Sequence, residues 1–110
     1  MGAPMVSDIS PAELKSRLSG ADAPFVLDVR EAWELEIARI DGVTHIPMNE
    51  IPQRIGELDP RRETVVMCRS GGRSLRVAQF LLGQGFSRVS NLVGGILAWG
   101  EDVDPTLRSY

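Results

Sequence analysis

The sequence predicts an α/β domain in which a mainly parallel sheet carries helices on both faces. Short apolar runs alternate along the chain with segments of helical periodicity, and the connections between them are short. Strands that alternate with helices run parallel, because each parallel pair needs a crossover connection. A length of 110 residues supports one domain over 1–110, whose core we place at about 7–100, with a short tail at 101–110.

Five segments have the spacing of helices. The first is the best marked, since Ser10 and Glu13 make a capping-box pattern, Pro11 takes the first helical position and Gly20 provides a stop. The other helical patterns cover 31–39, 51–58, 74–82 and 94–99.

Four apolar runs have the length of strands, at 25–29, 43–46, 64–67 and 88–92. The first of them is apolar except at Asp28, which is typical of a strand covered on both faces. In parallel sheets, ligands bind beyond the carboxyl ends of the strands. That rule selects the ends of two strands, Asp28 to Arg30 and Met67 to Arg69, and Cys68 lies in the second of them.

Composition excludes several kinds of protein. With 43% hydrophobic and 25% charged residues the chain is globular rather than disordered. Its one cysteine excludes an intrachain disulfide and fits a reducing compartment, and its one histidine leaves no cluster for a zinc or copper site. The net charge of -3 argues against general nucleic-acid binding.

The chain also lacks sequence signals for a membrane or for secretion. No apolar run approaches the ~20 residues that cross a bilayer. The segment 1–10 has no basic stretch leading into an apolar one, as a secretory signal requires. We therefore expect a cytoplasmic protein that does not contact membranes.

The segment from Cys68 to Ser74 has the pattern of an anion receptor. A strand stops at Cys68 and a helix begins near Arg73 or Ser74, so four residues must turn tightly: Arg69, Ser70, Gly71 and Gly72. Such a loop over a helix N-terminus turns several backbone N–H groups inward. These donors favour an exposed, nucleophilic thiolate. The alternative interpretation is a buried, inert cysteine beside an ordinary turn.

In its motifs the chain resembles the single-domain rhodaneses, a family of sulfurtransferases. The resemblance runs from about Ser7 to Gly100 and is carried, in family order, by LDVRE at 27–31, CRSGGRS at 68–74 and NLVGGILAWG at 91–100. It implies a five-stranded parallel sheet, with Cys68 as the catalytic nucleophile. The residues from Arg69 to Ser74 would then form the loop that binds substrate and persulfide.

The same resemblance implies a reaction. Sulfur would pass from a small-molecule donor such as thiosulfate to Cys68, and from its persulfide to cyanide, a thiol or an acceptor protein, without a metal or organic cofactor. One alternative is a rhodanese-like module that binds or regulates without catalysis. A phosphatase is disfavoured, because four residues rather than five separate Cys68 from Arg73 and the ring is small for a phosphate.

Several charged residues have open roles. Arg69 and Arg73 have the guanidinium geometry that holds an oxyanion. We interpret Asp28 and Arg30, which point the same way from their strand, as an ion pair, with donor attraction by Arg30 as the alternative. The sequence leaves open whether any of five arginines contributes to donor binding: Arg30, Arg39, Arg61, Arg62 and Arg76.

Three ring-bearing residues receive structural rather than catalytic roles. His45 is interpreted as a half-buried strand residue, since a thiolate needs no base. Trp33 and Trp99 are expected in the core or a groove wall.

The segment 38–43 departs from the Gly-His-Ile stretch of many rhodaneses and leaves the donor preference open.

Overall fold

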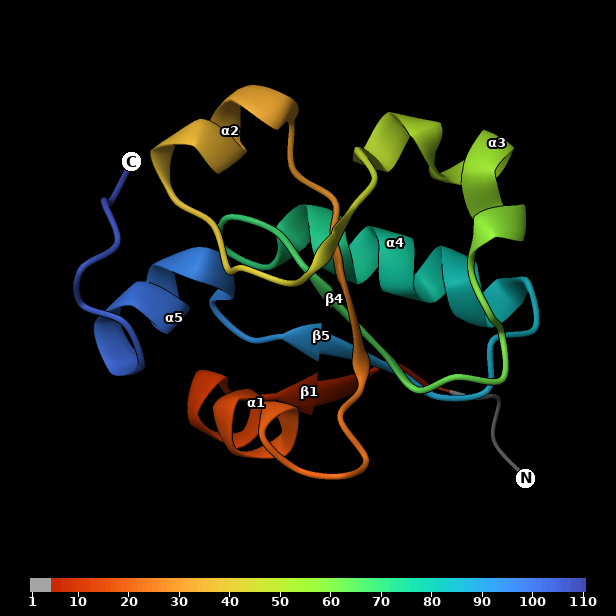
Figure 1. Ribbon diagram of the computed structural model, residues 1–110. Coiled ribbons are helices and arrows are strands. Elements are labelled where there is room, and N and C mark those ends of the chain that lie inside the picture. Colours follow the sequence, from red (N-terminus) through yellow and green to blue (C-terminus); the bar gives the residue numbers. More distant parts are fainter. Residues whose placement is uncertain (1–4) are drawn as a thin grey trace.

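The computed structural model describes residues 5–110 and shows a parallel sheet between two layers of helices (Figure 1). The sheet has five strands in the order β1-β5-β4-β2-β3. In chain order they are β1 (Ser7–Ile9), β2 (Phe25–Asp28), β3 (Thr44–His45), β4 (Thr64–Met67) and β5 (Val89–Leu92). The helices are α1 (Pro11–Leu18), α2 (Ala32–Ile37), α3 (Ile51–Arg54), α4 (Gly72–Gly83) and α5 (Gly95–Asp102). The predicted α/β fold with a parallel sheet is confirmed.

Apolar patterning located four of the strands but missed β1. Two of its three residues, Ser7 and Asp8, are exposed, so the segment carries no apolar run. It is a strand only because it pairs with β5, with Ile9 opposite Leu92. A five-stranded sheet, which the family resemblance implied, therefore needs a pairing that local sequence does not show.

Alternating side chains divide the core into two apolar layers on opposite faces of the sheet. α1 and α5 cover one face, where the strands contribute Val26, Val65, Met67 and Leu92. α3 and α4 cover the other face, where the strands contribute Leu27, Val66 and Val89. Trp99 of α5 is buried in the first layer, as predicted.

Helix α5 supports the loop that follows β4 from behind. The backbone N–H groups of Ile96 and Leu97 donate to the carbonyls of Cys68 and Arg69, at 2.9 and 3.2 Å. Gly95 makes this approach possible, because a Cβ there would lie 2.4 Å from the Arg69 carbonyl oxygen. The last helix can therefore lie directly against the Cys68 loop.

Beyond α5, the tail (residues 103–110) folds back along the domain toward α2 (Figure 1). Leu107 and Tyr110 pack against the apolar layer under α1 and α5. Residues 1–4, the start of the predicted 1–110 domain and of the segment searched for a signal, lie outside the described residues. Within 5–110 no helix combines the length and the apolar character of a membrane span.

Candidate active site at the Cys68 loop

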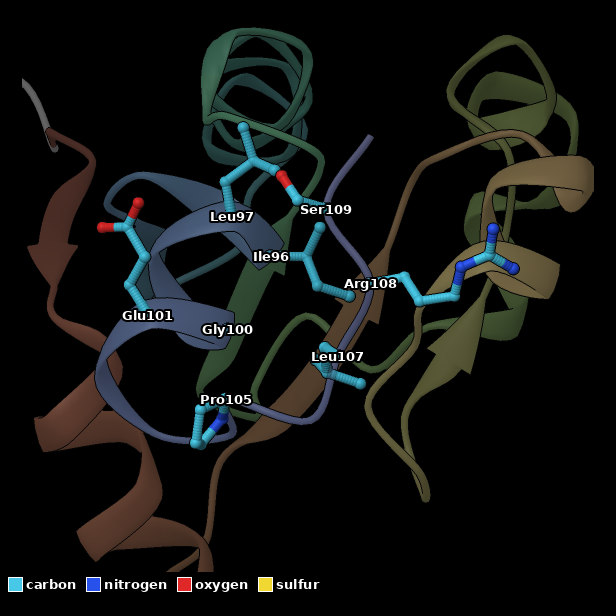
Figure 2. Close-up of a pocket in the computed structure, with 8 residues that line it drawn as sticks. All are labelled: Ile96, Leu97, Gly100, Glu101, Pro105, Leu107, Arg108 and Ser109. Atoms are coloured by element: carbon cyan, nitrogen blue, oxygen red, sulfur yellow. The ribbon is translucent and has the colours of Figure 1, made fainter.

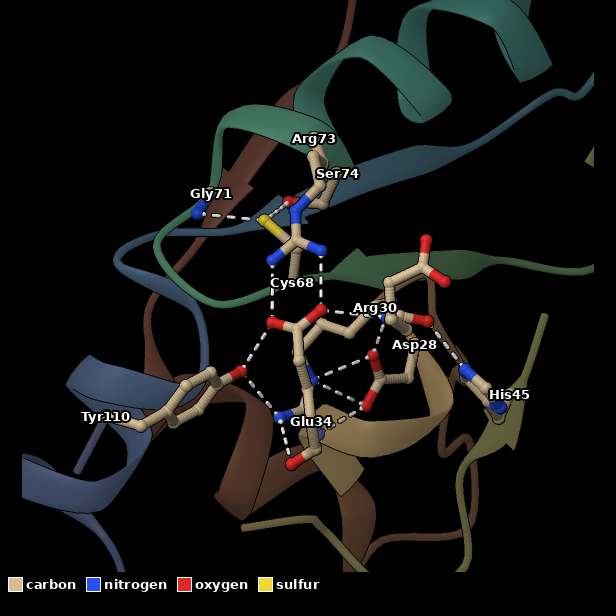
Figure 3. Close-up of polar contacts among 10 residues, drawn as sticks. Asp28, Arg30, Glu34, His45, Cys68, Gly71, Arg73, Ser74 and Tyr110 are labelled. Carbon is tan, nitrogen blue, oxygen red and sulfur yellow. Dashed lines mark hydrogen bonds and ion pairs between the residues drawn. The ribbon is translucent and has the colours of Figure 1, made fainter. Parts of the chain in front are cut away.

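The loop after β4 bends back so that hydrogen-bond donors meet the sulfur of Cys68 (Figure 3). Gly71 has a φ of +112°, a conformation that glycine adopts without strain, and caps α4. Its backbone N–H donates to Cys68 Sγ at 3.1 Å. Ser74 Oγ, in the first turn of α4, lies 3.2 Å from the same sulfur. The predicted convergence of loop donors on Cys68 is present.

These donors stabilise the thiolate against the effect of burial. Burial alone raises the pKa of the Cys68 thiol. The hydroxyl of Ser74 and the backbone N–H groups of Ser74, Gly71 and Ser70 outweigh it, so that the pKa lies below its usual value. The N-terminus of α4 adds a favourable dipole.

The expectation that Cys68 is exposed is wrong. The residue is 1% exposed and belongs to the apolar layer under α4 together with Val66 and Val77. The reason is geometric: the loop that brings donors to the sulfur also covers it. The burial expected for an inert cysteine is therefore combined with the hydrogen bonds expected for a reactive one.

The Ser74 hydroxyl has two partners but a single hydrogen. Ser74 Oγ lies 2.5 Å from Asn91 Oδ1 and 3.2 Å from Cys68 Sγ. The Asn91 amide cannot reverse without loss, because its Nδ2 donates to the Gly71 carbonyl at 3.2 Å. Because Ser74 has one hydrogen to donate, a bond to the Cys68 sulfur competes with the bond to Asn91.

Arg73 forms an ion pair with Glu34, whose carboxylate has further hydrogen-bond donors. Its guanidinium donates to both carboxylate oxygens of Glu34, at 2.7 and 2.8 Å. Glu34 also accepts from the Glu31 N–H at 2.8 Å and from the Tyr110 hydroxyl at 2.7 Å. Arg73 lowers the pKa of Glu34 to about 2, against the opposing effect of burial. Arg73 is thus held by a fixed carboxylate at α2.

Arg69 faces the tail. Its guanidinium lies 5.1 Å from the centre of the Tyr110 ring and donates to the main-chain oxygen of Tyr110. The Tyr110 ring also meets the ring of Trp33 edge to face, with 6.1 Å between centroids. Trp33 is 60% exposed, so of its two expected places the core is wrong and the groove wall stays a prediction.

Asp28 and Arg30 form the ion pair that the sequence suggested. Their side chains are both fully buried and join at 2.8 Å, and Arg30 Nη1 donates to the Tyr110 hydroxyl at 2.9 Å. His45 is half-buried on β3, as expected, and its Nε2–H donates to the Arg30 carbonyl at 2.6 Å. Arg30 is fully buried and its guanidinium is bound to Asp28 and Tyr110, so the ion-pair interpretation is confirmed and the guanidinium is not exposed to a sulfur donor in solvent.

The remaining arginines do not gather at the loop. Arg61 and Arg62 precede β4, and the Arg62 guanidinium lies 5.2 Å from the ring centre of Phe25, the first residue of β2. That is the amino end of the sheet, opposite Cys68. Arg76 lines a small groove beside α3, and the Arg39 side chain is 65% exposed after α2. Arg62 and its neighbour Arg61 therefore lie away from the Cys68 loop, and their position gives no support to a contribution to donor binding.

Three residues of the site were not singled out from the sequence. Glu34 lies three residues after Glu31 at the start of α2, a spacing that indicates a reciprocal cap. Asn91 is polar within an apolar run and close to a carboxyl strand end, which is a usable signal. Tyr110 reaches Glu34 across 76 positions of sequence, and no local pattern predicts that contact.

The comparisons with known proteins agree on one family. A family model described as Rhodanese-like domain matches residues 10–102. A protein named Sulfurtransferase from Allochromatium vinosum is 38% identical over 95 residues, which are 86% of this chain and 89% of that protein. Rhodanese-like/PpiC domain-containing protein 12, chloroplastic, from Arabidopsis thaliana is also 38% identical, but this chain spans only 38% of its length.

The solved structures show the same likeness in three dimensions. A rhodanese-like domain protein from Staphylococcus aureus superimposes with a TM-score of 0.83 at 28% sequence identity. The match covers 96% of this chain and 99% of that one.

Among residues 5–110, no group of three or more metal-binding side chains of the His, Cys, Asp or Glu type comes together.

Proposed function

The chain belongs to the rhodanese-like domain family, and on that premise we propose that it is a sulfurtransferase that carries sulfur as a persulfide on Cys68. The name of the Allochromatium vinosum relative, which matches nearly full length, supports sulfur transfer. The observation that carries the proposal is the pair of contacts at Cys68 Sγ, from the Gly71 N–H at 3.1 Å and from Ser74 Oγ at 3.2 Å. Both stabilise a negative charge on sulfur.

In the first half-reaction the Cys68 thiolate attacks the outer sulfur of a donor such as thiosulfate. A new S–S bond forms at Cys68, the S–S bond of thiosulfate breaks, and sulfite leaves with the electron pair of that bond. The persulfide keeps one negative charge on its terminal sulfur. The backbone N–H groups of Ser70, Gly71 and Ser74, which lower the pKa of Cys68, would stabilise that charge in the same way.

In the second half-reaction a nucleophile removes the terminal sulfur. Cyanide, a small thiol or the thiol of an acceptor protein attacks that sulfur and leaves Cys68 as a thiolate again. The chain contains no second cysteine, so transfer goes to another molecule. The sulfur travels on Cys68 itself, and the proposal needs no metal or organic cofactor.

Steady-state kinetics with thiosulfate and cyanide test the proposal. We expect thiocyanate formation with the parallel double-reciprocal lines of a ping-pong reaction, and complete loss of turnover in Cys68→Ala. Turnover by the alanine variant would refute the role of Cys68. A panel of other sulfur donors, with an aryl phosphate included, identifies the preferred donor and measures any phosphatase activity.

The burial of Cys68 favours one alternative, a module that binds a partner without catalysis. The 1% exposure of the cysteine is what such a module would have. This alternative predicts no sulfur transfer by the wild-type protein and unchanged partner binding by Cys68→Ser. Sulfur transfer by the wild type with loss in the variant excludes it.

A further inference from the structure

Tyr110 of the tail contacts the guanidinium of Arg69, the first residue after Cys68 in the loop. The Arg69 guanidinium lies 5.1 Å from the Tyr110 ring centre, within the range of a cation–π contact. The same guanidinium donates to the main-chain oxygen of Tyr110. One face and one N–H edge of Arg69 are therefore engaged by a residue from the far end of the sequence.

The phenol of Tyr110 is anchored on the opposite side of the loop. It donates to Glu34 Oε1 at 2.7 Å and accepts from Arg30 Nη1 at 2.9 Å (Figure 3). Burial raises the pKa of Tyr110, so the phenol remains a neutral donor at physiological pH. Because Glu34 keeps its two bonds to Arg73, the phenol can leave without breaking that ion pair.

The tail that carries Tyr110 is ordered but only partly packed. Asp104 fixes its start, since its carboxylate accepts from the Thr106 N–H at 3.1 Å. Between the tail and α5 lies an open cavity of about 370 Å³, lined by Ile96, Leu97, Gly100, Glu101, Pro105, Leu107, Arg108 and Ser109 (Figure 2). Tyr110 follows Ser109 of this cavity wall and is only half-buried against the apolar layer under α1 and α5, so a shift of its side chain uncovers the edge of that layer and leaves the strands in place.

We propose that Tyr110 determines donor affinity by competing with the anionic sulfur donor for Arg69. The inference rests on the proposed function and concerns the same site. A guanidinium matches the oxygens of a small oxyanion through two parallel N–H bonds, and Arg69 is less free to make them while the Tyr110 ring lies over it. Donor binding releases Tyr110 from Arg69, and departure of the oxyanion lets the tyrosine return.

Two variants of Tyr110 and one matched control test the competition. Tyr110→Ala removes the ring from Arg69 and keeps the main-chain oxygen that Arg69 also contacts, so it tests the ring alone. Tyr110→Phe keeps the ring but removes the hydroxyl bonds to Arg30 and Glu34. Ser109→Ala alters the neighbouring tail residue and is the control. We expect the KM for thiosulfate to fall about three- to tenfold in Tyr110→Ala, which corresponds to loss of one ordinary cation–π contact. The fall should be smaller in Tyr110→Phe and absent in the control.

Alkylation of Cys68 provides a readout that does not depend on sulfur transfer. Iodoacetate carries a carboxylate and iodoacetamide is its neutral analogue, so the ratio of their rates reports how freely Arg69 attracts an anion. We expect this ratio to rise in Tyr110→Ala by the same factor by which KM falls. If the alkylation ratio rises in Tyr110→Ala but the wild-type protein forms no thiocyanate, the proposed function is refuted, whereas competition between Tyr110 and an anion for Arg69 is supported.

Two results would overturn the competition. One is an unchanged ratio and an unchanged KM in both Tyr110 variants. The other is a lower kcat with KM and the alkylation ratio constant, which would make Tyr110 a positioning residue for Glu34 instead. If the alanine variant does not fold, Tyr110→Leu takes its place, because it keeps an apolar side chain but has no ring over Arg69, and the same fall in KM is expected.

Discussion

Replacing Glu34 by glutamine removes the carboxylate that holds the Arg73 guanidinium beside Cys68. Glu34 is 2% exposed and its two oxygens accept from Arg73 at 2.7 and 2.8 Å. The Arg73 bonds, together with the Glu31 N–H and the Tyr110 hydroxyl, lower the pKa of Glu34 from 4.5 to about 2, and one pKa unit corresponds to about 1.4 kcal/mol. The charged form of Glu34 therefore contributes about 3 kcal/mol to the free energy of unfolding at neutral pH.

The pH dependence of this contribution has a definite sign. In the unfolded chain Glu34 takes up its proton near its ordinary pKa of 4.5, whereas in the folded protein it does so only near pH 2. The stabilisation is therefore complete above about pH 5 and is lost as the pH falls from there toward 2. Urea unfolding of the wild type and of Glu34→Gln should differ most at pH 7, and the difference should shrink toward pH 3.

Glu57→Gln is the matched control. Glu57 also receives two bonds from one arginine, Arg54, at 2.8 and 3.0 Å, but its side chain is 56% exposed. Solvent screens that pair, so its loss should change stability far less than the loss of Glu34. Equal effects of the two substitutions, or a Glu34→Gln difference that does not vary with pH, would refute the reasoning.

The remaining predictions concern the sulfur and its loop. Ser74→Ala removes the strongest of the contacts that lower the pKa of Cys68, so the pH profile of iodoacetamide alkylation should move to higher pH, and a profile that stays in place would contradict the assignment. Gly95→Ala places a Cβ 2.4 Å from the Arg69 carbonyl oxygen and should destabilise the fold by about 2 kcal/mol or more in urea unfolding. Gly83→Ala, where a Cβ meets nothing within 4 Å, is its control and should change stability by about 1 kcal/mol or less.

Local pattern was sufficient for most of the fold. Apolar runs of strand length and a capped first helix predicted the main elements, because these features are properties of short segments. Ser10 Oγ indeed accepts from the Glu13 N–H at 3.1 Å. Strand β1 was missed, since Ser7 and Asp8 have no apolar partner and depend on pairing with β5.

The loop was predicted in part for the same reason. Its glycines and its position between β4 and α4 fixed the direction of the N–H groups toward Cys68. The burial of the sulfur was not foreseen, because it depends on how closely α4 and α5 approach the loop. The contacts of Glu34 and Tyr110 could not be predicted from local sequence, because they join α2, the loop and the tail across many positions.

The most direct measurement is the intact mass of the protein after incubation with thiosulfate alone, followed by removal of the donor. We predict that the wild-type chain gains the mass of one sulfur atom, that cyanide removes it, and that Cys68→Ala gains nothing. A wild-type mass that stays unchanged while the protein remains folded, or an equal gain in the alanine variant, would contradict a sulfur-carrying Cys68.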